Sequence, residues 1–169
     1  MLSAILSNKS CAECKFCCSF RRKSLWETPL FSEDEMKKLS HKFPDTKFQK
    51  IKKTEQTTKK FYTIDLSQAY KTNDPEEEAP CPFLDSHSGC KLSKDEKPFD
   101  CAIWPLRAMN KNGKTILALT PTCREINKLT IEEIMAFVNS SGLKKLILEK
   151  AEKNPAMIKE WKENFISLS

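Results

Sequence analysis

Glycine is scarce in this chain of 169 residues, which contains only Gly89, Gly113 and Gly142 at widely separated positions. Loops that cradle phosphate groups need clustered glycines, because only a backbone without side chains lets several N–H groups approach the anion. The sequence therefore excludes a phosphate-binding P-loop and the glycine-rich fingerprint of dinucleotide-binding folds.

Long apolar runs are also lacking. The longest uninterrupted one extends from Ile134 to Val138, whereas a membrane-spanning helix needs about 20 such residues. The first ten residues, MLSAILSNKS, have neither the basic start nor the apolar core of a secretory signal. Asn8, Lys9 and Ser10 precede Cys11, where a lipoprotein cleavage site would have small apolar residues. We therefore expect a cytoplasmic protein with no membrane partner.

Arginine is the third scarce residue, with four among the 29 basic side chains. The net charge of +6 is unevenly spread: residues 1–60 carry +7, residues 61–100 carry −5 and residues 101–169 carry +4. The forked guanidinium is the usual reader of base edges and phosphates, whereas a lysine excess is typical of a solvated surface. The sequence thus argues against a nucleic-acid partner, the only candidate footprint being Lys47 to Lys60.

Cysteine, by contrast, is abundant, with eight residues. They are Cys11, Cys14, Cys17, Cys18, Cys81, Cys90, Cys101 and Cys123. In a reducing compartment such a set indicates metal or redox chemistry before disulfides. A chain of this length can also bury roughly 70% of its unfolded surface, so its core does not depend on cross-links.

The first four cysteines lie within the segment CAECKFCC. A C-x2-C spacing lets two thiolates converge on one ion, about 2.3 Å from each sulfur. The longer C-x2-C-x2-C pattern matches the first three ligand positions of a bacterial ferredoxin loop, whose further cysteine precedes a proline, as Cys81 does here. Neighbouring side chains diverge, so we expect either Cys17 or Cys18 to join Cys11 and Cys14 and the other to reach toward the later cysteines.

All eight cysteines are candidate metal ligands, and we expect the four of the N-terminal loop to meet the four between residues 81 and 123. Ligation by cysteine alone favours an iron–sulfur cluster, with structural zinc as the alternative and disulfides or unligated thiols as a third reading. Eight thiols would allow two four-thiolate centres. His87 could replace a thiolate on zinc, but SHSG indicates a turn, and His41 is expected on a helix surface.

Four segments together resemble a known family: CAECKFCC, CPFLDSHSGC, KPFDCAIWP and TPTCREI. They are similar to the YkgJ-type cysteine-cluster family, described as zinc- or iron-chelating proteins with a CxxCxxCC signature. The resemblance extends from about Cys11 to Cys123 and includes PLFSEDEMKKL. It implies that the cysteines are metal ligands, Cys123 being the less regular last member. Phe16 replaces a common glycine of the family, and Lys97 and Ala102 stand where arginines are frequent.

Relatives of that family include proteins described as flagellin lysine N-methylases, which implies an alternative function. Such an enzyme needs a site for S-adenosylmethionine, but the chain has no glycine-rich strand-to-helix turn. CAECKFCC also lacks the C-x3-C-x2-C spacing associated with radical use of that cofactor. We therefore expect a redox, accessory or metal-cluster module with a protein partner or substrate of unknown identity. Lysine methylation and a purely structural zinc site are the alternatives.

Three groups of neighbouring residues could assist a metal site. The polar candidates, which could equally be surface or turn-capping residues, are Glu13, Asp85, Asp100 and Arg107. The aromatic residues expected to shield the site from water are Phe16, Phe20, Phe83, Phe99 and Trp104. The basic residues that could lower thiol pKa values, or form a solvated turn, are Arg21, Arg22 and Lys23.

The expected elements before residue 120 are a helix, two strands, an acidic loop and a hairpin. Ser32 and Glu35 form a capping-box pattern for a helix that Pro44 ends. Two β segments flank the polar run KKTEQTTKK, and the acidic loop KTNDPEEEAP follows, where prolines should prevent a regular element. Asn112–Gly113 predicts a type I′ turn between paired strands over residues 106–119.

The C-terminal pattern predicts three helices. The first begins at a Thr130–Glu133 capping box and ends at Gly142, and the second runs from Leu143 to Lys153. The third should start at Pro155, with a stripe of Ile158, Trp161, Phe165 and Leu168.

The expected fold class is therefore α+β in a single domain, residues 1–169. It comprises a cysteine-cluster body over residues 1–123, with a short β-hairpin, and a C-terminal three-helix region over residues 124–169.

Overall fold

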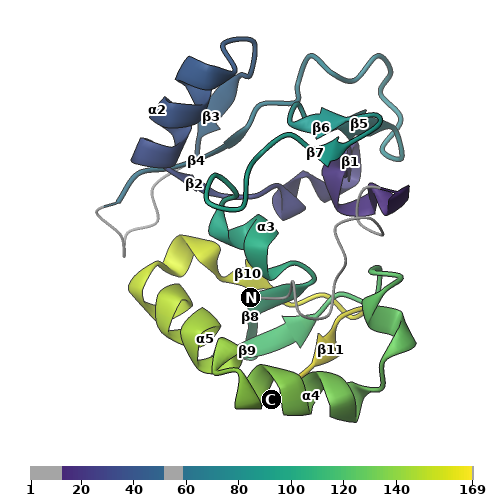
Figure 1. Cartoon of the computed structure of the whole chain (residues 1–169), viewed down its shortest axis with the longest axis vertical. Coiled ribbons are helices and arrows are strands. Elements are labelled where there is room, and N and C mark those ends of the chain that lie inside the picture. Colours follow the sequence, from purple (N-terminus) through teal and green to yellow (C-terminus); the bar gives the residue numbers. More distant parts are fainter. Residues whose placement is uncertain (1–12, 52–58, 169) are drawn as a thin grey trace. The chain divides into compact units, whose positions relative to one another are not determined.

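A computed structural model describes residues 13–51 and 59–168 of the chain, which divides into two compact units (Figure 1). Residues 13–51 and 59–102 form one of them, here named the cysteine unit, and residues 103–168 form the C-terminal unit. The body expected over residues 1–123 is thus split, since Cys123 belongs to the C-terminal unit. A single domain over the whole chain stays a prediction.

Helix α2 (Glu33–Lys42) in the cysteine unit confirms the predicted capping box. The Ser32 hydroxyl accepts from the Glu35 backbone N–H at 3.3 Å, and the Glu35 carboxylate accepts from the Ser32 N–H at 2.7 Å. Acidic residues occupy the first turn and basic residues the last, which complements the helix dipole. The helix ends at Lys42 with Phe43 as its C-cap, immediately before Pro44, as the sequence indicates.

A three-stranded antiparallel sheet accompanies this helix, in the order β2 (Phe31–Ser32), β4 (Phe61–Ile64) and β3 (Phe48–Lys50). The pairing of β3 with β4 confirms the two predicted β segments. Aromatic rings form much of the core beneath. Phe83 is 2% exposed, and its ring centroid lies 5.2 Å from that of Phe43 and 6.2 Å from that of Phe31.

Two short ribbons complete the cysteine unit. Strand β1 (Ser19–Arg21) pairs with β5 (Glu78–Pro80), and β6 (Leu84–Asp85) pairs with β7 (Gly89–Cys90), both antiparallel. Short 3-10 helices, η2 (Phe16–Cys18) and η3 (Arg22–Glu27), flank β1. The acidic segment thus ends in a strand that its prolines were expected to prevent. Pro80 fits there as the last residue of a short two-stranded ribbon, which tolerates proline better than a central strand does.

The C-terminal unit is built on the predicted hairpin, which the structure confirms as β8 (Leu106–Lys111) and β9 (Lys114–Leu119). Asn112 and Gly113 have φ angles of 54° and 79°, the left-handed values that a type I′ turn requires at both central positions. Side chains of both strands are buried, among them Leu106, Met109 and Leu117. This hairpin forms the centre of a four-stranded sheet.

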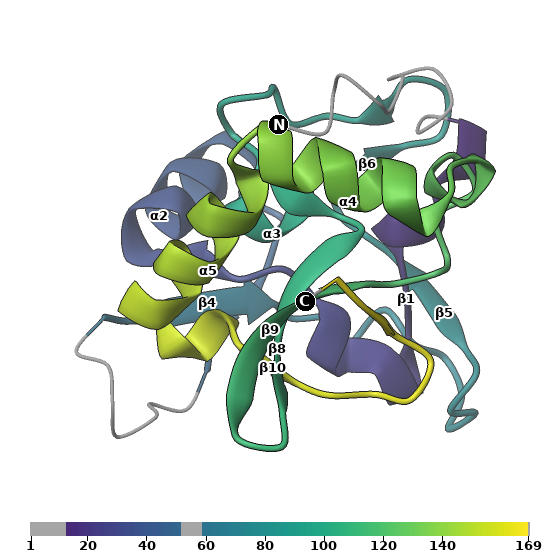
Figure 2. The same cartoon turned by 90° about the horizontal axis from the view of Figure 1, so that it is seen from below.

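The first two C-terminal helices are also confirmed. They are α4 (Ile131–Ser140), whose N-terminus has the Thr130–Glu133 capping box, and α5 (Leu143–Lys153). Gly142 joins them with a φ of 69°. Helix α5 packs on the β8–β9 hairpin (Figure 2) through a face that includes Ile147 and Ala151, both fully buried. A short 3-10 helix, η4 (Ile126–Lys128), precedes α4.

The predicted third helix is wrong. Pro155 begins only a 3-10 turn, η5 (Pro155–Met157), and the chain then forms two edge strands, β10 (Lys159–Glu160) and β11 (Ile166–Ser167). Strand β10 pairs in parallel with β8, and β11 pairs antiparallel with β9. Both edges of the hairpin offer unpaired backbone groups, and pairing with them takes precedence over the helical spacing of the apolar residues. The apolar residues Phe165 and Leu168 are nevertheless buried.

No helix within residues 13–51 and 59–168 is long and apolar enough to cross a membrane.

Candidate metal centre

The β1–β5 ribbon brings the two halves of the cysteine pattern together. Ser19 lies opposite Pro80, and Phe20 lies opposite Ala79. Continuing this register by one residue places Cys18 opposite Cys81, and the Cys81 N–H donates to the Cys18 carbonyl at 2.8 Å. Phe20 and Ala79 are buried in the core of the unit. Cys81 packs against this core, and Cys18, the last residue of η2, lies opposite it.

Cys90 reaches the same place through the β6–β7 pair. It lies opposite Leu84, whose N–H donates to the Cys81 carbonyl at 2.9 Å. Cys81 and Cys90 are both half-buried and pack against the apolar core. The turn closed by the Leu84 N–H and the β6–β7 pairing thus bring Cys81 and Cys90 together, although they are nine residues apart.

Cys17 completes the group, here named the thiol cluster: Cys17, Cys18, Cys81 and Cys90. Cys17 is exposed, and a hydrogen bond with the Cys18 thiol is the main cause that raises its pKa. Burial raises the pKa of Cys81 to about 12, and the nearby Cys90 and Cys17 add to this shift. These interactions favour the protonated form of both thiols, and a metal that binds them must release their protons.

The donor chemistry of the thiol cluster fits thiophilic metals, since it offers sulfur alone. The seven cysteines that the structure describes form no disulfide with one another. Within the described ranges, however, no three Cys, His, Asp or Glu side chains are arranged so that they could hold a metal ion. The backbone brings the donors to one region, and their side chains are not in a ligating arrangement.

The remaining predicted ligands are distributed differently. Cys14 is half-buried just before η2, and Cys101 is exposed on α3 (Phe99–Ile103). Cys123 is half-buried in the C-terminal unit. Cys11 lies outside the described residues. We expected the four N-terminal cysteines to meet the four later ones. The structure brings together two of each group: Cys17 and Cys18 with Cys81 and Cys90.

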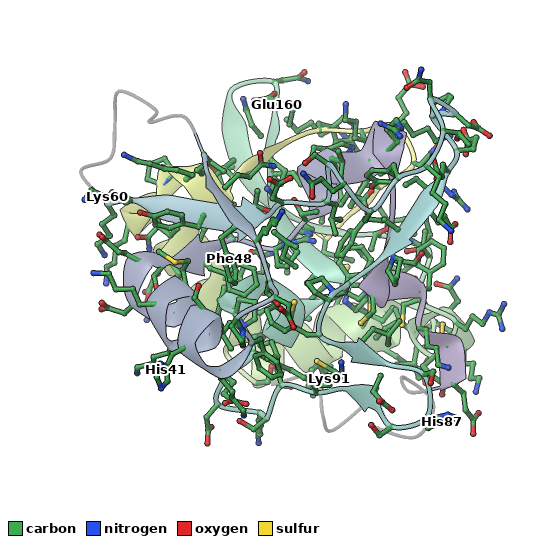
Figure 3. The ribbon with its side chains drawn as sticks, turned by 90° about the horizontal axis from the view of Figure 1, so that it is seen from above. His41, Phe48, Lys60, His87, Lys91 and Glu160 are labelled. Carbon is green, nitrogen blue, oxygen red and sulfur yellow. The ribbon has the colours of Figure 1, made fainter. Side chains whose placement is uncertain are left out.

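Neither histidine belongs to the thiol cluster. His41 is exposed on α2, as expected from the sequence, and His87 is exposed in the turn between β6 and β7. Figure 3 shows the two side chains far apart within the cysteine unit. The His87 N–H donates to the Asp85 carboxylate at 2.9 Å, so this residue has the turn role that SHSG indicates.

The basic residues after Cys18 do not have the role that the sequence suggested. Arg21 pairs with Glu78 at 3.0 Å, Arg22 pairs with Glu77 at 3.4 Å, and Lys23 pairs with Glu76. Their charges are therefore compensated by the acidic segment. The pKa values of Cys17 and Cys81 are raised, whereas unpaired cations beside these thiols would lower them.

Two of the five proposed shielding aromatics lie in the core of the cysteine unit: Phe20 and Phe83. Phe16 is 40% exposed, so its expected shielding role is wrong; it lies on the one-turn helix η2, which buries none of its residues. Phe99 is half-buried on α3. Trp104 belongs to the C-terminal unit, where the Arg107 guanidinium lies 4.8 Å from the centroid of its ring.

Asp85 and Asp100, two of the polar residues that could assist a metal site, have structural roles. The Asp85 carboxylate accepts from the backbone N–H groups of His87 and Ser88, and these contacts lower its pKa to about 2. Asp100 is buried and accepts from the Leu30 N–H at 3.0 Å. Glu13 is exposed. These contacts match the turn-capping alternative for Asp85.

Sequence reasoning missed Lys15, which lies between the cysteines of the N-terminal loop. Its φ is 52°, an unusual left-handed value for a lysine, and its carbonyl accepts from the Cys18 N–H at 3.0 Å. Its ammonium donates to the Ser86 carbonyl in the turn that precedes Cys90. No feature of the sequence distinguishes this lysine from the many others, because only the folded backbone shows its conformation.

Acid is expected to weaken the segment that leads to Cys81, through Glu77. The hydrogen bond from the Lys71 N–H is the largest cause that lowers the pKa of Glu77, and the bond from the Thr72 hydroxyl is the second. Together they hold this pKa at about 2, below its ordinary value of 4.5. A lowered pKa stabilises the folded state above pH 4.5, and this contribution is lost as the pH falls toward 2. Urea unfolding of the metal-free protein across this range should show that loss, and Glu77→Gln should remove it. An identical pH dependence in both proteins would contradict the prediction.

Comparison with known proteins gives no matching family model, no matching curated protein and no matching solved structure.

Proposed function

We propose that this protein binds a metal centre through cysteine thiolates, an iron–sulfur cluster being favoured and zinc the alternative. The observation that carries the proposal is the meeting of Cys18 with Cys81 across the β1–β5 ribbon, with Cys17 and Cys90 beside them. These four thiols come from distant parts of the chain and offer sulfur alone, and both histidines lie elsewhere. Such a set suits iron–sulfur clusters and four-thiolate zinc.

The thiol cluster would hold the metal, with Cys14, Cys101, Cys11 and Cys123 as the further predicted ligands. The buried rings of Phe20 and Phe83 lie in the core against which Cys81 and Cys90 pack. Apolar surroundings of this kind limit water access and tune the potential of a bound cluster. A bound iron–sulfur cluster would supply one-electron transfer, so a redox or accessory module in the reducing cytoplasm is the proposed role. The methylase alternative gains no support from the described residues.

Metal analysis of the protein purified without oxygen tests this proposal directly. We expect iron and acid-labile sulfide together, with a brown colour that fades in air, because thiolate-bound clusters absorb visible light and oxidise. Stoichiometric zinc without colour would support the alternative. Replacing the exposed His87, which lies outside the thiol cluster, by alanine is the control and should leave the metal content unchanged. A protein that folds without metal, and acquires none on reconstitution with iron and sulfide or with zinc, would contradict the proposal.

A further inference from the structure

The segment before Cys81 is closed into a compact loop by one carboxylate. Glu77 accepts hydrogen bonds from the Lys71 N–H at 2.6 Å, the Thr72 N–H at 2.8 Å and the Thr72 hydroxyl at 2.7 Å. Three donors on one ionised carboxylate make charge-assisted bonds, which are stronger than neutral ones. Glu77, the residue just before β5, therefore holds the start of this loop, Lys71 and Thr72, close to the strand.

Arg22 and Tyr70 attach this loop to β1. The Arg22 guanidinium lies 4.5 Å from the centroid of the Tyr70 ring and donates to the Thr72 carbonyl and to Glu77. The Tyr70 hydroxyl donates to the Phe20 carbonyl at 2.8 Å, in a buried position. These residues are here named the Glu77 node: Arg22, Tyr70, Thr72 and Glu77.

The Glu77 node lies in the same ladder as the thiols. The Arg22 N–H donates to the Glu77 carbonyl at 3.0 Å, and the register of β1 with β5 places these two residues opposite each other. Each is four residues from its cysteine: Arg22 from Cys18, and Glu77 from Cys81. If the Glu77 node fixes how β1 aligns with β5, it also determines which residue after β5 lies opposite Cys18.

The exposed charges of the ribbon cannot determine this register. Residues 21–23 are all basic and residues 76–78 are all acidic, so a shift by one residue would still bring opposite charges together. Such a shift would also turn each side chain of β5 to the other face of the ribbon, and Cys81 would leave the core side. The contacts that join the two segments, from Arg22 to Tyr70, Thr72 and Glu77 and from Tyr70 to Phe20, belong to the observed alignment. Glu77 holds Thr72 at a fixed place relative to β5, so a shift by one residue would break these contacts.

We propose that Glu77 is a positioning residue for the thiol cluster: together with Arg22 and Tyr70 it fixes the register in which the chain presents Cys81 to Cys18. The part that concerns metal affinity rests on the proposed function. The part that concerns the register applies to the metal-free protein and stands without it.

The matched pair Glu77→Ala and Glu78→Ala tests this inference. Both remove one negative charge, and Glu78 is closer in sequence to Cys81, but its contacts are an exposed ion pair with Arg21 and a hydrogen bond from Ser19. Amide hydrogen exchange of Cys81, measured by NMR on the reduced, metal-free protein, reports the bond to the Cys18 carbonyl. We expect about tenfold faster exchange in Glu77→Ala and at most about threefold in Glu78→Ala.

Zinc affinity, measured by competition with a chelator, should fall more in Glu77→Ala than in Glu78→Ala. Co²⁺ binding to Glu77→Ala should also show weaker thiolate charge-transfer absorption, because Cys81 is no longer aligned. Should the alanine variant unfold, Glu77→Gln keeps the size of the side chain and should show the same order with smaller effects. Equal exchange rates at Cys81 in the Glu77 and Glu78 variants would overturn the inference. Protein that binds neither zinc nor an iron–sulfur cluster, yet shows the expected exchange, would refute the proposed function alone.

Discussion

Replacing Cys81 by serine is expected to lower the affinity for Zn²⁺ by roughly a hundredfold or more. Cys81 has Cys18 opposite it in the backbone ladder and Cys90 and Cys17 nearby. Changes to residues that only support a ligand already cost about 10- to 100-fold, so loss of a ligand should cost at least the upper value. Competition with a chelator measures the affinity, and the Co²⁺ charge-transfer band reports the lost thiolate.

The matched control is Cys123→Ser, the same chemical change in the C-terminal unit. A smaller effect there would indicate that the thiol cluster provides the essential ligands. A loss of equal size in both variants would indicate that all eight cysteines participate, as the sequence pattern predicts. Unchanged Zn²⁺ affinity in Cys81→Ser would contradict the proposed metal centre.

Phe83→Ala should lower the free energy of unfolding by about 3–5 kcal/mol, the usual cost of removing a buried phenylalanine ring. Phe83 is 2% exposed, and its ring contacts those of Phe31, Phe43 and Phe48. The truncation would leave a cavity among rings that come from three different segments of the chain. Urea unfolding of the reduced, metal-free protein measures this change without a contribution from bound metal.

Phe16→Ala provides the control for this core prediction, because that ring is 40% exposed. Its removal should change the free energy of unfolding by no more than about 0.5 kcal/mol. If Phe83→Ala were equally mild, the aromatic core would contribute far less to stability than its burial indicates.

Local signals in the sequence account for the elements that were predicted correctly. The capping boxes at Ser32 and Thr130 each satisfy backbone groups within a few residues, so their helices begin where the pattern indicates. Asn112–Gly113 likewise specifies its turn by backbone preference alone, and the two strands of the hairpin follow. Such features depend on neighbours in the chain, and tertiary contacts reinforce them.

The third C-terminal helix failed because its signal was ambiguous. Ile158, Trp161, Phe165 and Leu168 have helical spacing, but that spacing does not distinguish a helix from short strands separated by turns. The Trp161 N–H donates to the Asn110 carbonyl at 3.0 Å, and the Leu168 N–H donates to the Leu117 carbonyl at 2.9 Å. Both acceptors belong to the hairpin, which no local pattern in residues 155–168 reveals.

The role of the charged residues near the thiols could not be read from the sequence either. Arg21, Arg22 and Lys23 are adjacent to Cys18 in sequence, which suggested an effect on thiol pKa values. The fold instead pairs them with the acidic segment about fifty residues later. These ion pairs depend on the pairing of β1 with β5, which no pattern of residue types in either segment predicts.

The sequence by itself determined the starts of the two capped helices, the hairpin turn and the abundance of cysteine among the candidate ligands, because each depends on residue type and short spacing. Only the tertiary structure decided that Cys18 lies opposite Cys81, that Cys123 belongs to another unit and that Glu77 closes the loop before β5. The physical reason is that backbone hydrogen bonds between distant strands select one register, and the chemistry of this protein's cysteines depends on that selection.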